Sequence, residues 1–583
     1  MMKKTIKYLM LILLILVSLG AARPLFFPGF FPMHDNVQVA RVYEMSKSLS
    51  FGQIPVRLVS DLGYGYGYPI FNFYAPLPYY IGGAFNLLFF DSLTSTKIMF
   101  VVGIVLSGLS MFFLINEITD GIAAFTAAVF YIYAPYHAVN IYIRGAVGEF
   151  YAYAFVPLIA LGLIKILKIS KARLSDIDNK LERKDISVNI IRGVVIGSSG
   201  ISGVLLSHNI LGMLLLYYLF AFLIVYLLFF FRGKRNYQQM IGILFMILLG
   251  IGLSSFFTIP AFMEKKYTRV DSLIQKGSDF HLHFVYPEQL WDSSWGFAGS
   301  APGKEDGMSF KIGKLHIFLA ISSLIILIAK RRKIGKKYLY FYFSILIILI
   351  SSIFMMVDIS TPFWNLLPLF SYIQYPWRFL NITLFALVVL SSFIFRFLNN
   401  PYKIGLSIVL IISVIYLNIR YFVPSGLLQV KASDYINLDE LHFNMSKISD
   451  EYLPKEFNPP ENINQVALSG IPSIGSIKVV RSVEEPTHKI YDLELVEPQK
   501  LLTNIAYLPG WKVFIDGNLV EVINSAGRLM LTVPEGKHSV EFVLGQTAAR
   551  IVGNTISLLS LFLLVYVSLF QLNIFYGHKK IFR

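Results

Sequence analysis

Long apolar stretches separated by shorter polar connections dominate the chain. A helix that crosses a bilayer needs about 20 predominantly apolar residues, and twelve stretches approach that length. The pattern therefore predicts a polytopic α-helical membrane protein with about twelve spans. They lie near residues 6–22, 97–116, 120–138, 150–168, 190–207, 209–231, 238–259, 312–329, 338–357, 377–397, 401–420 and 550–573.

Composition agrees with this pattern. Hydrophobic residues make up 55% of the 583 residues and charged residues only 15%, whereas soluble domains carry about a quarter charged residues. The net charge of +16 is concentrated beside apolar stretches. It therefore indicates membrane topology and attraction to anionic lipid, and not a nucleic-acid partner. There are no cysteines, which excludes disulfides, thiolate metal sites and cysteine nucleophiles.

Basic residues predict the orientation, because loops rich in lysine and arginine face the cytoplasm. Lys3, Lys4 and Lys7 place the N-terminus there, and we interpret the first apolar stretch as a retained helix and not as a cleaved signal peptide. Alternate connections carry the later basic residues, so both termini are predicted to be cytoplasmic in a multi-pass plasma-membrane protein. These are Lys171, Arg173, Lys180, Arg183, Lys184, Arg232, Lys234, Arg235, the run 330–337, Arg396, Lys403, Lys579, Lys580 and Arg583.

This count also decides how Pro76 to Phe90 is read. The stretch is apolar, but counting it as a span would move residues 171–184 outside. We therefore expect a helix that lies on the outer face or dips into it. The outer side then holds the segments 23–96, 139–149, 260–311, 358–376 and 421–549.

Segment 421–549 is polar and rich in strand signals, which predicts a small extracytoplasmic β-rich domain before the last span. Asp516-Gly517 between Val513–Ile515 and Val520–Ile523 indicates a hairpin. A second hairpin is expected around residues 534–537. The chain thus divides into a transmembrane core, 1–420, with the outer loop 23–96, the β-rich domain, 421–549, and a final helix with a basic tail, 550–583.

The first outer loop holds the most informative polar residues. Asp35 comes soon after the first span, and it and the adjacent His34 are candidates for catalysis. A carboxylate there suits a general base for an acceptor hydroxyl or a ligand for a divalent cation such as Mg²⁺ or Mn²⁺, although such a pair also occurs as a helix cap. Arg41 and Arg57 of the same loop are candidates for substrate binding.

Glycine and tyrosine alternate between Gly63 and Tyr68 in this loop, and Tyr74 follows. Glycine lets a backbone approach a ligand closely. Aromatic rings suit either the faces of sugars or the membrane interface. Tyr66 and Tyr74 are therefore candidates for substrate binding, with an interfacial tyrosine belt as the alternative.

Other polar residues fall at the outer ends of spans. Charged groups in such places are costly and therefore candidates for function. An arginine there suits the phosphate of a lipid through charge-assisted hydrogen bonds, or it extends to lipid headgroups. No third ligand accompanies His281 and His283 to make a metal site. The candidates are Glu149 as a second catalytic acid and, for substrate binding, Arg144, His208, Gln374, Trp377 and Arg378.

Several of these segments together resemble a known family. An acid soon after the first span, followed by a surface helix, resembles the class-C glycosyltransferase fold. Within it, the chain is similar to YfhO-like membrane proteins and to those labelled 6-pyruvoyl-tetrahydropterin synthase-related. The matching segments are 34–35 with Arg41, 52–57, 65–69, 73–77, Ile143-Arg144 with Glu149, 206–208, 374–378, 451–454, 507–511, Asp516-Gly517 and 536–538.

This resemblance implies transfer of a sugar from a polyprenyl-phosphate donor to a glycan, lipid or protein acceptor on the outer face. It assigns Asp35 the role of acceptor base or metal-organising ligand, and Glu149 corresponds to the second acid of the class. Pterin synthesis is not expected, because that enzyme is soluble and needs a three-histidine zinc site, which no histidine spacing here matches.

Two alternatives remain at this stage. A transporter or flippase of lipid-linked sugars would carry broken helices and charges deep in its spans. The polar candidates here lie at the outer ends, which favours an enzyme. A non-catalytic scaffold of cell-envelope assembly would keep the fold without the chemistry, and Asp35 is the residue that distinguishes that case.

Overall fold

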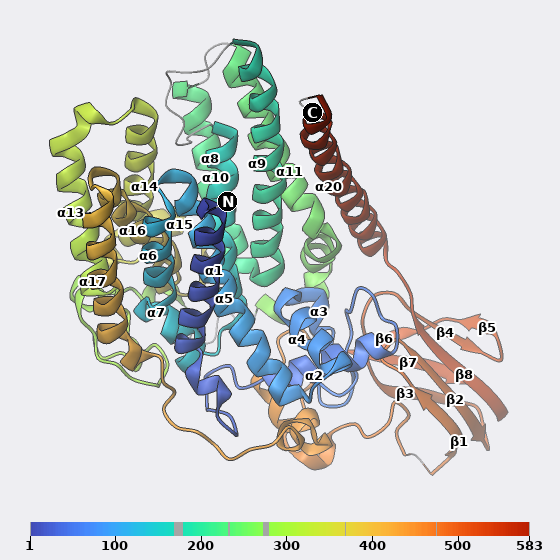
Figure 1. Ribbon diagram of the computed structural model, residues 1–583. Helices are drawn as coiled ribbons and strands as arrows, with labels where there is room; N and C mark the ends of the chain where they lie inside the picture. Colours follow the sequence, from blue (N-terminus) through green and yellow to red (C-terminus); the bar gives the residue numbers. More distant parts are fainter. Residues whose placement is uncertain are drawn as a thin grey trace.

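A bundle of long helices with a small sheet domain at one end makes up the computed structural model (Figure 1). The structure describes residues 2–167, 179–230, 234–271, 279–367, 369–473 and 475–581. The bundle helices are α1 (Met2–Ala21), α5 (Ser92–Ile118), α6 (Gly121–Ile132), α7 (Pro135–Ala138), α8 (Val147–Leu167), α9 (Asn179–Ser207), α10 (Asn209–Phe230), α11 (Lys234–Glu264), α13 (Lys314–Lys330), α14 (Lys336–Phe354), α16 (Leu380–Ser392), α17 (Asn400–Asn418) and α20 (Ala548–Ile581).

The predicted polytopic helical fold with a β-rich domain before the last helix is confirmed. Within the described residues, eight helices are long and apolar enough to cross a membrane. The number rises to nine if α6 and the segment Pro135–Ile143, bent by 49°, form one span. Thr5–Ala21 and Asn209–Val225 are shorter apolar helices, and α13 has 17 residues. The predicted twelve spans are reached only if these three also cross.

Pro76 to Phe90 forms no span. Its helix, α4 (Leu77–Leu88), has 12 residues, or about 18 Å at 1.5 Å per residue, against a hydrocarbon core of about 30 Å. It packs on α2 (Gln38–Ser50) and α5. Together with α3 (Ile70–Phe73), these helices lie at the end of the bundle that carries the sheets (Figure 1). We call this the sheet-domain end.

Contacts join the five segments predicted to face outward at this end. Bridges link Phe30 to Leu428 and Thr268 to Pro454. The His34 N–H donates to the Ile143 carbonyl at 3.0 Å, and the Tyr372 hydroxyl donates to Asp271 at 3.1 Å. Segments that lie far apart in the sequence therefore share one side of the bundle, as the alternation of spans predicts. Short helices run through them: α12 (Pro287–Trp291), α15 (Thr361–Leu366), α18 (Ser433–Ile436) and α19 (Ser446–Ile448).

The opposite end of the bundle carries Arg396 and Lys403, two of the basic residues used for the topology, together with Lys165. Lys165 binds Glu117 at 2.8 Å, and Lys403 binds Asp120 at 2.5 Å. The Arg396 guanidinium donates to the Ile118 carbonyl at 2.6 Å. Lys171, Arg173 and Arg232 lie outside the described residues, as does Arg583.

The sheet domain is a sandwich of two antiparallel sheets. One sheet has the order β1-β2-β8-β4-β5 and the other β3-β7-β6. Alternate residues face inward, and Leu493, Val513, Leu531 and Phe542 are among those that form a buried core between the sheets. The strands are β1 (Ile477–Glu484), β2 (His488–Leu495), β3 (Gln499–Ala506), β4 (Trp511–Ile515), β5 (Asn518–Val520), β6 (Ile523–Ser525), β7 (Arg528–Val533) and β8 (Gly536–Leu544).

One of the two predicted hairpins is present. β4 and β5 pair around Asp516-Gly517, and both turn residues have positive φ, 49° and 81°, as a type I′ turn requires. The prediction of a hairpin around residues 534–537 is wrong. β7 pairs with β3 and β6, whereas β8 pairs with β2 and β4. The connection crosses between the sheets, because the apolar faces of β7 and β8 pack across the core.

A buried ion pair ties the last helix to the bundle. The Arg550 guanidinium donates to Glu264 Oε2 at 2.9 and 3.2 Å. Thr547 and Asn72 donate to the same carboxylate at 2.6 and 2.8 Å. This joins α20, α11 and the first outer loop. In Figure 1, α20 lies at the edge of the bundle beside α11.

Arg550→Ala should lower the thermal unfolding temperature of the protein in detergent by several degrees. The variant leaves the Glu264 carboxylate buried without its cation, which costs about 3–5 kcal/mol. Lys304→Ala is the matched control, because Lys304 and Glu288 form an exposed pair and surface pairs contribute little. Equal unfolding temperatures for the two variants would contradict this role for the pair.

Candidate functional site

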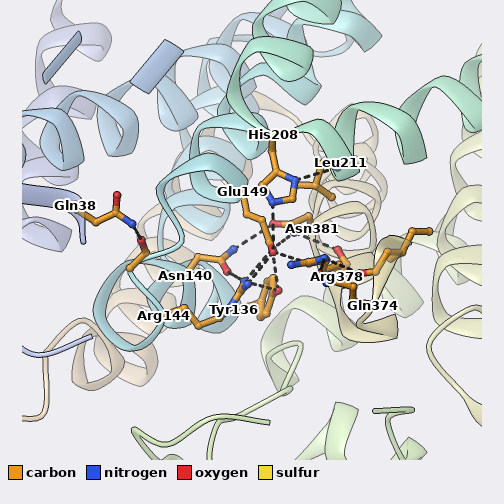
Figure 2. Close-up of polar contacts among 12 residues, drawn as sticks. Gln38, Tyr136, Asn140, Arg144, Glu149, His208, Leu211, Gln374, Arg378 and Asn381 are labelled. Carbon is orange, nitrogen blue, oxygen red and sulfur yellow. Dashed lines mark hydrogen bonds and ion pairs between the residues drawn. The ribbon is translucent and has the colours of Figure 1, made fainter. Parts of the chain in front are cut away.

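A carboxylate with no exposed surface lies at the centre of the polar residues of the sheet-domain end. Glu149 is in the first turn of α8, and its side chain is 0% exposed. Arg144 binds it with two parallel hydrogen bonds, Nη2 to Oε1 at 2.8 Å and Nη1 to Oε2 at 2.9 Å. The Nε of Arg378, far away in the sequence, donates to Oε1 at 2.9 Å. Figure 2 shows both guanidinium groups directed at Glu149.

Neutral side chains complete the shell around this carboxylate. Asn381 Nδ2 donates to Oε2 at 3.3 Å, as does the Tyr136 hydroxyl at 3.4 Å. Asn140 accepts from Arg144 at 2.7 Å and donates to Asn381 at 3.3 Å. We call Tyr136, Asn140, Arg144, Glu149, Arg378 and Asn381 the Glu149 cluster. With two guanidinium groups and one carboxylate, its formal charge is +1.

The local backbone explains how Arg144 and Glu149 come to face each other. Val139–Ile143 forms a π-helical turn, a feature frequent at functional sites. Gly145 follows with φ of 62°. A Cβ at this glycine would lie 2.1 Å from the Met33 sulfur, so both conformation and space require glycine here. The turn reverses the chain between the two charged residues.

His208 and Gln374 lie next to the cluster. The His208 Nε2 is 4.0 Å from Glu149 Oε1, and its Nδ1 accepts from the Leu211 N–H at 3.1 Å. Burial lowers the pKa of His208 to about 3, so the ring is neutral with its proton on Nε2. Gln374, with φ of 66°, accepts from Arg378 at 3.2 Å. Trp377 lies under the Arg144 guanidinium at 4.4 Å.

His208 and Gln374 also line a cavity of about 320 Å³, which we call the His208 cavity. Such a volume lies within the range of ligand pockets, about 300–1,000 Å³. Apolar side chains of α9, α10 and α11 form much of its wall, and polar groups gather at the sheet-domain end. The lining residues are Phe73, Tyr74, Ala75, Leu205, Ser207, His208, Asn209, Ile210, Met213, Phe257, Thr258, Ala261, Phe262, Lys265, Val270, Leu369, Tyr372, Gln374 and Tyr452.

The first outer loop brings Asp35 against the cluster. The Asp35 N–H donates to the Arg144 carbonyl at 2.9 Å, and the His34 N–H donates to the Ile143 carbonyl at 3.0 Å. The Asp35 carboxylate is partly exposed and accepts no hydrogen bond within the described part of the chain. The His34 ring is exposed and contacts the Phe297 carbonyl at 3.1 Å. Of the two acids predicted to be catalytic, only Asp35 is therefore open to a ligand.

Arg41 and Tyr74 form the neighbouring wall. The Arg41 guanidinium lies 4.5 Å from the Tyr74 ring and donates to Ser449 at 2.9 Å. Burial raises the pKa of Tyr74 well above its usual value, and among smaller causes the charge of Asp35 raises it further. Tyr74 thus senses the charge of Asp35 and also lines the cavity. Burial also raises the pKa of Glu451, which accepts from Ser449 at 3.1 Å.

Two predicted site residues lie elsewhere. Arg57 donates to Asn72 at 2.9 Å and to Asn554 and the Phe256 carbonyl at 3.0 Å, beside the Glu264–Arg550 pair. Tyr66 packs edge-on against Phe457 at 5.0 Å. Its carbonyl accepts from the Ala506 N–H at 2.8 Å. The glycine-tyrosine run therefore joins the helix bundle to the segment that carries the sheets.

Sequence reasoning missed several residues of the site. Asn140 and Asn381 are amides inside apolar stretches, and their cost in such places is the signal that could have identified them. Tyr136 carries no comparable signal among many tyrosines. Lys265 looks like an ordinary cation at a helix end, and only its place in the cavity distinguishes it.

Glu149→Gln should destabilise the protein by several kcal/mol, because two buried guanidinium groups would then lack their counter-ion. Arg144→Met should do the same. The double variant should lose much less stability than the sum of the losses of the two single variants, because the two residues interact directly. Thermal unfolding in detergent provides this double-mutant cycle. Additive losses would show that the pair is not the stabilising unit described here.

Comparison with known proteins gives a family and distant structural similarities. No curated protein matches the chain. The Archaeoglobus fulgidus oligosaccharyltransferase in the apo form is 13% identical, with a TM-score of 0.45, over 79% of this chain and 61% of that one. The same protein tethered with an acceptor peptide is 15% identical, with a TM-score of 0.44, over 80% of this chain and 61% of that one.

A third structure shows this oligosaccharyltransferase, AglB, in complex with an inhibitory peptide and a dolichol-phosphate. It is 14% identical, with a TM-score of 0.43, over 80% of this chain and 61% of that one. The chain thus covers 61% of the length of these archaeal chains. A family model described as "6-pyruvoyl-tetrahydropterin synthase related domain; membrane protein" matches residues 71–424. The match covers most of the bundle and the Glu149 cluster, and it confirms the predicted family. The chain belongs to this family of membrane proteins.

Proposed function

We propose that the chain is an integral membrane glycosyltransferase that moves a sugar from a polyprenyl-phosphate donor to an acceptor glycan, lipid or protein. One observation carries this proposal. The His208 cavity has apolar walls formed by bundle helices and a polar end that adjoins the cationic Glu149 cluster. A lipid with an anionic head matches both parts.

The roles of the two acids follow from their surroundings. Glu149 is fully enclosed and already accepts from two guanidinium groups, so we assign it a positioning role. Asp35 is partly exposed beside Arg144. In the proposed reaction its carboxylate takes the proton of the acceptor hydroxyl. The acceptor oxygen bonds to the anomeric carbon, the bond from this carbon to the phosphate oxygen breaks, and polyprenyl phosphate leaves. A single base suffices if the configuration at the anomeric carbon inverts.

Cations near the cavity support such a departure, because fixed positive charge stabilises negative charge that develops on a leaving phosphate. The Glu149 cluster contributes a formal charge of +1 beside the cavity wall. Glu149 is occupied by arginines, and the described residues contain no group of three His, Asp or Glu side chains placed to hold a metal ion. A divalent cation here would have the Asp35 carboxylate and the donor phosphate as its ligands, and the proposed step does not depend on it.

Asp35→Asn should reduce sugar transfer by about 10²–10⁴-fold, the usual contribution of a general base, while expression and membrane insertion stay unchanged. The assay offers polyprenyl-phosphate sugars to the purified protein together with native membranes as the acceptor pool. It then measures the polyprenyl phosphate released. Asp279→Asn, an exposed acid at the same end, is the control and should retain activity.

Unchanged release by the Asp35→Asn variant would remove Asp35 from the mechanism. If the wild-type protein releases no polyprenyl phosphate but moves the intact donor across a bilayer, the transporter alternative would replace the proposed enzyme.

We also propose that the sheet-domain end faces outward across the plasma membrane. The absence of cysteines permits a clean test with single introduced cysteines. Lys478→Cys lies on β1 in the sheet domain, and Lys333→Cys lies in the basic turn at the opposite end, both at exposed positions. A membrane-impermeant maleimide should label the first in intact cells and the second only after permeabilisation. The reverse pattern would invert the proposed orientation.

A further inference from the structure

The cation that contacts a bound donor need not come from the Glu149 cluster. Arg144 and Arg378 both bind Glu149, and neither lines the His208 cavity. Among the described residues that line this cavity, Lys265 is the only one with a lysine or arginine side chain, and His208 is neutral. The structure therefore separates the two arginines of the Glu149 cluster, which lie outside the cavity lining, from Lys265, which is part of that lining.

Lys265 is held in place without being neutralised by a carboxylate. It lies in the single turn Lys265–Tyr267 that follows α11, and it is partly exposed. Its ammonium group donates to the Tyr372 hydroxyl at 3.3 Å and lies 4.8 Å from the centre of that ring. The Tyr372 hydroxyl in turn donates to Asp271 at 3.1 Å. Within the described part of the chain, Lys265 forms no ion pair.

The chemistry of this arrangement suits a phosphate group. An ammonium group has three donors, of which one binds the Tyr372 hydroxyl, so donors remain for an anion. Lysine binds phosphate as a point charge. The neighbouring carboxylate, Glu264, is occupied by Arg550 and Thr547, so it does not compete for the ammonium group.

The position of Lys265 suits a lipid-borne phosphate. The residue directly follows α11, at the sheet-domain end of this long apolar helix. Phe257, Ala261 and Phe262 of the same helix, with Ile210 and Met213 of α10, form an apolar wall of the cavity. An isoprenoid chain along this wall would bring its phosphate to the height of Lys265.

We propose that Lys265, positioned by Tyr372, binds the phosphate of polyprenyl phosphate in the His208 cavity. The inference rests on the proposed function for the identity of the lipid. Binding of the lipid phosphate can nevertheless be measured without sugar transfer. A general site for anionic phospholipid is the competing source of the same phosphate chemistry.

The test measures binding of polyprenyl phosphate and of the uncharged polyprenol to the purified full-length protein in neutral-lipid nanodiscs. Lys265→Gln should raise the Kd for polyprenyl phosphate at least about tenfold, which corresponds to about 1.4 kcal/mol. It should leave the Kd for polyprenol unchanged. Lys265→Arg keeps the charge and should retain most of the affinity. Lys266→Gln is the matched control, because Lys266 is the exposed next residue and does not line the cavity.

Unfolding temperatures of all variants show whether a loss of binding reflects a loss of fold. Equal affinities of Lys265→Gln and Lys266→Gln for polyprenyl phosphate would overturn the assignment of Lys265. Competition by phosphatidic acid at equal concentration would replace it with a general headgroup site. If the wild-type protein binds polyprenyl phosphate but transfers no sugar, the proposed function fails while the binding site stands.

Discussion

The need to neutralise one buried carboxylate organises the sheet-domain end of the bundle. A charge removed from water must find opposite charge and hydrogen-bond donors nearby. Glu149 finds Arg144 across a glycine turn and Arg378 from a segment more than 200 residues later. The need to neutralise Glu149 therefore fixes the position of the turn before α8 relative to the turn before α16. It also sets the position of His208, since its ring lies against the same carboxylate.

A second buried carboxylate, Glu264, shows that such clusters do not by themselves define a site. Glu264 joins α11 to α20 and the first outer loop through Arg550, Thr547 and Asn72, and none of these three partners lines the His208 cavity. The Glu149 cluster differs because His208 and Gln374 connect it directly to that cavity. A buried cluster is a candidate site when it contacts a cavity that a ligand can enter. Without such a contact, its role is to hold helices together.

Much of the fold could be predicted from local patterns. The apolar stretches and the alternation of basic connections indicate which segments share a side, because both depend on the lipid environment of each segment alone. Asp516-Gly517 marks its hairpin because the turn demands positive φ at both residues. The error at residues 534–537 has another origin. Alternating residues on β7 and β8 show that each strand has a buried face, but not whether the two pair or pack across the sandwich.

The candidate site was harder to predict from the sequence, because the role of a polar side chain, like the pairing of a strand, depends on which other residues it meets in the fold. Arg57 and Arg144 are both arginines of predicted outer segments, and only their partners, Asn554 for Arg57 and Glu149 for Arg144, give them different roles. Sequence reasoning selects arginines because they bind phosphate well. Yet a buried arginine also needs hydrogen-bond acceptors inside the protein, and Arg57, Arg144 and Arg378 each find them there. A lysine at the end of a helix needs no such partner, since the interface solvates it. The division between structural arginines and an available Lys265 therefore follows from where each residue meets water.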